Sequence, residues 1–178
     1  MPKTRQRYTA ERVSILGVLL GVSLVLSFLE NLIIPASFLP PGVKFGLSNV
    51  IVMYCLFFMD KKDALTVGLL KSLFVFLLRG AVGGLLSFTG SIFSIGVMSL
   101  LLLLSVRKVS YLMISICGAV AHNLGQMFMV VLIMGNSAYF YYFPVLFLSG
   151  IIMGTITALV MRGAMPVFIY MYKKMKTS

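Results

Sequence analysis

Two short segments of a strongly apolar chain carry side chains that can hold a ligand. They read LPPGVKFGLSNV, at residues 39–50, and AHNLGQ, at residues 121–126. Together they supply one lysine, one histidine and three amides: Lys44, Asn49, His122, Asn123 and Gln126. Such groups recognise a small polar molecule by charge and hydrogen bonds. The prolines and glycines of the first segment predict a tight turn that aims a helix N-terminus, with Lys44 beside it, at the ligand.

The elements that must position these residues are membrane-spanning helices. The chain has 178 residues, of which 60% are hydrophobic and 11% charged, and its mean hydropathy is +1.06. Soluble domains are about 25% charged, so this composition excludes a water-soluble fold. The apolar runs are long and continuous, which favours helices over the alternating strands of a barrel. The sequence therefore predicts an all-α membrane protein with a single domain over residues 1–178.

The apolar runs predict six transmembrane helices, over residues 13–33, 46–59, 64–79, 86–104, 111–134 and 145–168. Six spans place both termini on one side of the membrane. If that side is the cytoplasm, all basic residues except Lys44, Lys71 and Arg79 lie in cytoplasmic segments, where basic residues normally collect. We therefore expect a multi-pass protein with its N- and C-termini inside. The same rule explains the net charge of +11 without a nucleic-acid partner.

The three exceptional cations are candidates for a functional site. Lys44 and Arg79 lie at the outer ends of predicted helices, and Lys71 lies within one. A charge inside the bilayer costs several kcal/mol unless it faces water or a partner, so it marks a site by default. The alternative is that these long side chains reach up to lipid headgroups.

Polar residues of several predicted helices share helical faces. Ser87, Ser91 and Ser94 lie on one face of residues 86–104, as do Gly118, His122 and Gln126 on residues 111–134. These faces and the outer ends of the helices predict a pocket that opens outward, with nine candidate substrate-binding residues: Glu30, Asn31, Lys44, Asn49, Lys71, Arg79, His122, Asn123 and Gln126. One carboxylate against three cations favours an anionic or electron-rich ligand. His122 could instead be an ordinary packing residue with its hydrogen bonds satisfied.

The segments at residues 39–50 and 121–126 resemble the paired motifs of the bacterial Gx transporter family. Its members are often labelled heptaprenyl diphosphate synthase component I, and they are similar to substrate-binding S components of energy-coupling factor (ECF) transporters. FLENLIIP before the first motif and GNSAYFYYFP after the second keep the order of the family. The resemblance implies a six-helix, S-component-like bundle in the bacterial cytoplasmic (inner) membrane that captures a small molecule from outside. It carries the ligand-binding role to the five residues of the two motifs.

The resemblance also implies a docking face on the first predicted helix. S components dock on a shared coupling subunit, which works with ATPases, through small residues spaced by four. Gly17 and Gly21 occupy comparable positions here, as glycines in place of the usual alanines. They lie on a different side of the helix from Glu30 and Asn31, where another helix can approach closely.

Three hypotheses of function follow. The first is a substrate-binding and uptake subunit, and the chain has no G-x-x-x-x-G-K-[ST] nucleotide site of its own. The second is a membrane adaptor of an electron-transfer system, in contact with electron-transfer proteins and a quinone or flavin. The third is an accessory subunit of a prenyl diphosphate synthase. Synthesis relies on aspartate-rich Mg²⁺ sites, and the only aspartates are Asp60 and Asp63. We therefore expect no catalytic residues, metal site or cofactor, and an anionic, flavin-, quinone- or isoprenoid-related ligand.

Overall fold

The computed structural model describes the backbone of residues 3–33, 48–104 and 110–177, and the side chains of residues 10, 12–29, 32, 48–104 and 110–170. Its elements are α1 (Lys3–Ile33), α2 (Asn49–Phe58), α3 (Lys61–Leu104), α4 (Tyr111–Met134), the 3₁₀ helix η1 (Ser137–Tyr142) and α5 (Phe143–Thr177). Four apolar segments, in α1, α3, α4 and η1–α5, are long enough to cross a membrane. The prediction of an all-α, multi-pass membrane protein is confirmed.

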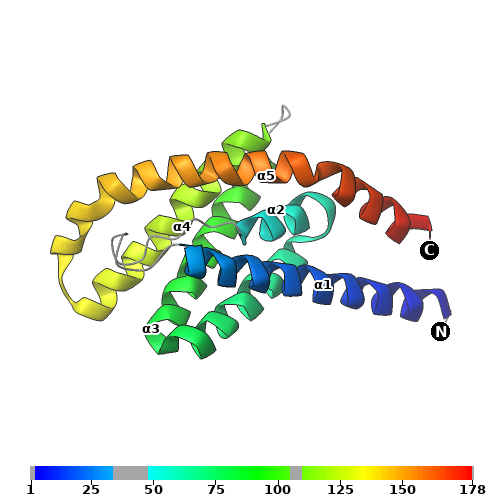
Figure 1. Cartoon of the computed structure of the whole chain (residues 1–178), viewed down its shortest axis with the longest axis horizontal. Coiled ribbons are helices and arrows are strands. Elements are labelled where there is room, and N and C mark those ends of the chain that lie inside the picture. The colour runs from blue at the N-terminus through cyan, green and yellow to red at the C-terminus, as the bar shows by residue number, and fades with distance from the viewer. Residues whose placement is uncertain (1–2, 34–47, 105–109, 178) are drawn as a thin grey trace.

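The predicted count of six separate transmembrane helices is wrong for the described part of the chain, which holds five α-helices. The helices predicted over 64–79 and 86–104 belong to one element, α3, in which only Gly80 leaves helical geometry, with φ 75° and ψ −175°. Glycine adopts positive φ without steric cost, so a single residue reverses the chain where the predicted ranges left a break over residues 80–85. Residues 61–79, the first arm, and 81–104, the return arm, then pack antiparallel (Figure 1).

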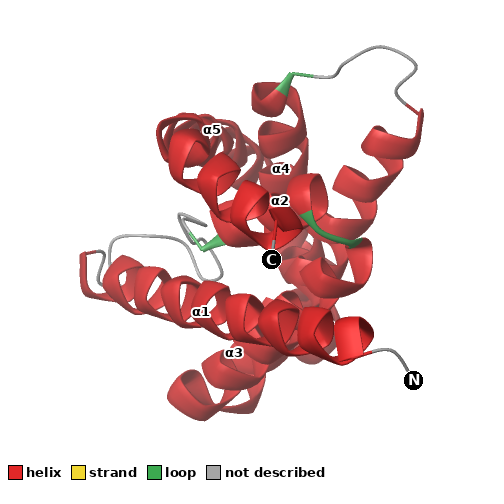
Figure 2. Ribbon diagram, turned by 90° about the vertical axis from the view of Figure 1, so that its right-hand side faces the viewer, coloured by secondary structure: helices red, strands yellow, loops and turns green. Residues whose placement is uncertain are grey.

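α2 is a short helix in the centre of the molecule. Its ten residues rise about 15 Å, half the thickness of a bilayer core, and every residue from Val50 to Leu56 is buried. A helix that is apolar on all sides must be enclosed. α2 contacts α3, and Figure 1 and Figure 2 both show it between α1 and α5. The span predicted over 46–59 is therefore a central core helix, and the first two residues of that span lie outside the described ranges.

α4 is the helix that positions most of the candidate site, and its bounds are those that the sequence predicts. The hydroxyl of Ser110 accepts a hydrogen bond from the amide of Leu112 at 3.3 Å, and Gly135 ends the helix with φ 62°. α4 packs between α3 and α5 through glycines. A Cβ atom on Gly125 would lie 2.7 Å from the carbonyl oxygen of Thr89 in α3. Small residues of this kind let membrane helices approach closely.

α1 is the least buried of the long helices. In its apolar window 17% of residues are buried, against 33–39% in the other three. Its N-terminal half is fixed by Arg12, whose Nε donates to Oδ2 of Asp63 at 3.2 Å and whose Nη2 contacts the carboxylates of Asp60 and Asp63. These contacts tie α1 to the turn between α2 and α3. The start of α1 and the end of α5 lie at the same end of the molecule (Figure 1).

We predict that Arg12→Gln destabilises the fold by about 1–2 kcal/mol, because it leaves the Asp63 carboxylate with less compensation. The side chain of Asp63 is 10% exposed and that of Asp60 is 64% exposed, so Asp60→Asn should cost less. Thermal unfolding of the purified protein in detergent measures the difference. Arg162→Gln, which removes an exposed positive charge from α5, is the control. An equal loss in both arginine variants would contradict a specific anchor.

Candidate functional site

The polar face of α4 lies inside the helical bundle. The side chains of His122, Asn123 and Gln126 are 1–4% exposed. Gly90 on the return arm of α3 makes room for two of them, because a Cβ atom there would lie 2.8 Å from Cε1 of His122 and 3.0 Å from Cγ of Gln126. The structure therefore brings His122 and Gln126 together against α3.

Gln126 holds a complete carboxamide in this interior. It is 1% exposed, and neither Oε1 nor Nε2 has a hydrogen-bond partner among the described residues. Ser91 follows Gly90 in the return arm. Its hydroxyl is also buried without a hydrogen-bond partner among the described residues. A buried amide without partners lowers the stability of a protein by about 1–3 kcal/mol, as mutational data on other proteins show. One donor group and one acceptor are thus buried without a partner in this set.

Asn123 is directed to the other side of α4. Its Nδ2 donates to the carbonyl oxygen of Leu146 at 3.0 Å and to Oγ of Ser149 at 3.2 Å, both in α5. The amide thus links α4 to α5, whereas His122 and Gln126 lie against α3. The predicted trio on α4 is divided between two interfaces.

Lys71 and Asn49 form a second polar contact. Lys71 lies in the first arm of α3, is 4% exposed, and donates from Nζ to Oδ1 of Asn49 at 3.0 Å. Asn49 is the first residue of α2 and is half-buried. Lys71 is the one buried cation that the described ranges contain. The contact ties α2 to α3 and places a positive charge in the interior.

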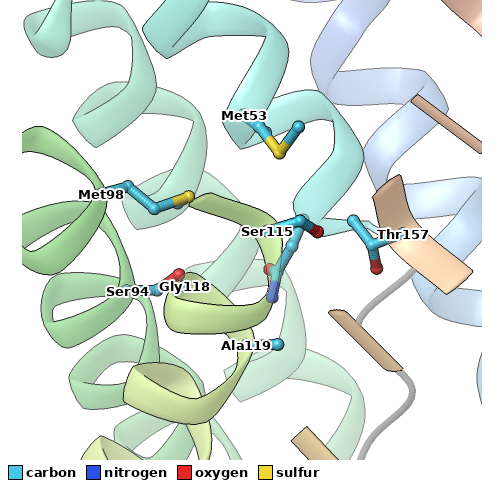
Figure 3. Close-up of a pocket in the computed structure, with 8 residues that line it drawn as sticks. Met53, Ser94, Met98, Ser115, Gly118, Ala119 and Thr157 are labelled. Atoms are coloured by element: carbon cyan, nitrogen blue, oxygen red, sulfur yellow. The ribbon is translucent and has the colours of Figure 1, made fainter. Parts of the chain in front are cut away.

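Asn49 also lines a small cavity between four helices. The cavity measures about 10 Å³, which is close to the lower limit for one water molecule. Figure 3 shows Ser94 and Met98 of α3 facing Thr157 of α5 across it, with Met53 of α2 on another side. Gly118, Ser115 and Ala119 of α4 complete the lining. Polar groups of all four helices thus meet at one level, one helical turn along α4 from His122.

The remaining predicted residues are placed as follows. Arg79 is exposed and ends the first arm of α3, so it lies at the tip of the hairpin and not in the buried cluster. Lys44 lies outside the described residues, and so do the side chains of Glu30 and Asn31, although their backbone belongs to α1. Gly17 and Gly21 are exposed, with open space around both.

Three features of the site were not predicted. Gly90 sets the space for His122 and Gln126, and Ser115 and Thr157 contribute hydroxyls to the cavity. Ser115 precedes Gly118 by three residues, so helical spacing could have added it to the polar face of α4. Gly90 and Thr157 carry no such signal, because their role depends on which helix they face. The described residues contain no group of three His, Cys, Asp or Glu side chains that could hold a metal ion.

Most of the chain matches one known protein family. A family model described as heptaprenyl diphosphate synthase component I matches residues 19–164, a range that includes α2, α3 and α4. The comparisons with curated proteins and with solved structures found no match.

Proposed function

The chain belongs to the heptaprenyl diphosphate synthase component I family, and from that premise we propose that it is a substrate-binding integral membrane subunit. In this proposal it captures a small molecule from the extracellular side for uptake with an ECF-type energising module. The observation that carries the proposal is the buried carboxamide of Gln126, with both polar atoms unpaired among the described residues.

A bound ligand would supply the hydrogen-bond partners that Gln126 lacks among the described residues. The amide of Gln126 offers one acceptor and two N–H donors, and it lies beside the imidazole of His122 in a space that Gly90 keeps open. Buried polar groups in native proteins nearly always have partners, and the need is stronger in a membrane interior. A small molecule with its own donor and acceptor would remove the cost. The buried ammonium of Lys71 favours a ligand with an anionic or electron-rich part.

The positions of the two aspartates favour a binding role over prenyl diphosphate synthesis. Asp60 and Asp63 both contact Arg12 at the α2–α3 turn, whereas Gln126 lies between α4 and the return arm of α3. Prenyl diphosphate synthesis needs clustered aspartates to hold Mg²⁺. We therefore propose that the protein binds its ligand and leaves it chemically unchanged.

The same proposal places α1 against an energising partner. Gly17 and Gly21 lie one helical turn apart and are exposed, and a Cβ atom added to either would meet nothing within 4 Å. Such a face lets a helix of a coupling subunit approach closely. We propose that the protein lies in the bacterial cytoplasmic membrane with both termini inside, since that orientation puts most basic residues in the cytoplasm. The ATPases would then lie on the side of the termini.

The test is ligand binding by the purified full-length protein, with a panel of vitamins, flavins, quinones and isoprenoids. We expect one saturable ligand, and Gln126→Met should weaken its binding roughly 10- to 100-fold because the amide contacts are lost. The same variant should unfold at a higher temperature without ligand, since it no longer buries an unpaired amide. Thr66→Val, which removes an exposed hydroxyl from α3, is the control.

Two outcomes would contradict the proposal. One is unchanged affinity of Gln126→Met for a ligand that the unmodified protein binds saturably. The other is co-purification with a quinone-reducing dehydrogenase or a flavoprotein, without any coupling subunit or ATPase, since that result would favour an electron-transfer adaptor.

A further inference from the structure

A second site candidate lies on the hairpin of α3, away from Gln126. A groove of about 350 Å³ runs between the two arms of α3. Its walls are apolar side chains that are 38–58% exposed: Leu69, Leu73, Phe76, Leu85 and Phe88. Its floor is formed by Ser72 and Gly84, which are buried. Because α3 contains a candidate membrane span, this groove faces hydrocarbon.

The floor of the groove has no unsatisfied hydrogen-bonding group among its described residues. A Cβ atom on Gly84 would lie 2.5 Å from Cβ of Phe76, so the arms are in close contact there. The hydroxyl of Ser72 donates to the carbonyl oxygen of Gly68 at 2.8 Å, which satisfies it within its own helix. The groove thus offers shape and apolar area. These walls match a hydrocarbon chain.

One end of the groove carries a cation. Arg79 lies three residues beyond Phe76, and its Cβ would be 2.7 Å from a Cβ atom on Gly83. Its aliphatic stem therefore lies along the return arm next to the groove, and the residue is exposed at the hairpin tip. Arginine binds phosphate oxygens through two parallel hydrogen bonds.

We propose that this groove and Arg79 form a binding site for an anionic phospholipid. One acyl chain lies between the arms and the phosphate lies on Arg79. From Leu69 to Phe76 the groove is about 10 Å long, a third of the hydrocarbon thickness. That length holds the upper part of one acyl chain while the second chain stays in the bilayer. It would leave most of a long isoprenoid uncovered. The site does not depend on the proposed function.

The chain has no tryptophan, so a single introduced tryptophan can report on lipid contact. Phe88→Trp places the probe on the groove wall. Leu77→Trp places it on a lipid-facing position of the first arm that is 74% exposed and does not line the groove. Each full-length variant is reconstituted in mixtures of phosphatidylcholine and phosphatidylglycerol, and fluorescence quenching by brominated forms of either lipid is measured.

At Phe88→Trp we expect lipid contact to favour phosphatidylglycerol over phosphatidylcholine roughly fivefold. One cation near anionic lipid contributes about 1 kcal/mol, which corresponds to that ratio. At Leu77→Trp we expect no preference. Arg79→Gln should abolish the preference at Phe88→Trp, and Arg162→Gln should keep it. Equal quenching by both lipids at Phe88→Trp would overturn the proposal, and so would a preference that survives Arg79→Gln. Displacement of phosphatidylglycerol by an equimolar polyprenyl phosphate would also overturn it, in favour of an isoprenoid site.

Discussion

Gly154→Val is expected to prevent α4 and α5 from packing together. A Cβ atom at this position would lie 2.5 Å from Cα and 2.9 Å from the backbone nitrogen of Ile116, and 3.0 Å from the carbonyl oxygen of Ser115. These are backbone atoms of α4, so the helices themselves would have to separate. Separation also breaks the hydrogen bond that Oγ of Ser115 donates to the carbonyl oxygen of Gly154 at 2.7 Å. We expect a loss of about 3 kcal/mol or more, at the upper end of overpacking effects.

The matched control is Gly163→Val, in the same helix. A Cβ atom on Gly163 meets nothing within 4 Å, so the two variants share the cost of a β-branched residue in a helix and differ only in the contact with α4. The measurement is thermal unfolding in detergent, with size-exclusion chromatography to detect aggregation. If both variants lost the same stability, the close approach of α4 and α5 would not be what Gly154 provides.

Asn49→Leu is expected to destabilise the protein by about 1–3 kcal/mol, because it takes the amide acceptor away from the buried ammonium of Lys71. The effect should depend on the charge. Lys71→Met removes the cation together with the need for an acceptor, and burying a charge is costly in itself. We therefore expect Lys71→Met to be close to neutral, and Asn49→Leu to cost little in that background.

A double-mutant cycle on Asn49 and Lys71 measures this coupling directly. Unfolding is followed in the same detergent for both single variants, the double variant and the unmodified protein. Additive effects in the double variant would show that the 3.0 Å contact between Nζ and Oδ1 contributes nothing specific.

Local signals in the sequence predicted the parts of the fold that depend on one helix at a time. The apolar run at residues 111–134 predicted one helix, and α4 has these bounds. The spacing of Ser87, Ser91 and Ser94 placed these residues on one face, and all three are buried. Helical periodicity is a local property, so it is visible without knowledge of the neighbours.

Relations between helices could not be predicted in this way. The spacing of His122 and Asn123 did not show that one lies against α3 and the other bonds to α5. The contact between Lys71 and Asn49 joins residues 22 positions apart in two helices. The predicted helix count failed at Gly80 for a related reason, because composition suggests a break but does not give its length.

The reversal at Gly80 has a consequence for how the chain length can vary. Helix connections normally absorb insertions, since an added residue in a flexible loop changes little else. Here a residue inserted beside Gly80 would extend an arm, rotate everything beyond it by about 100° relative to the other arm, and turn the buried serines toward lipid. Homologous chains that keep this hairpin should therefore have the same number of residues between the positions of Ser72 and Ser87. That fixed spacing can serve as a reference when sequences of the family are aligned.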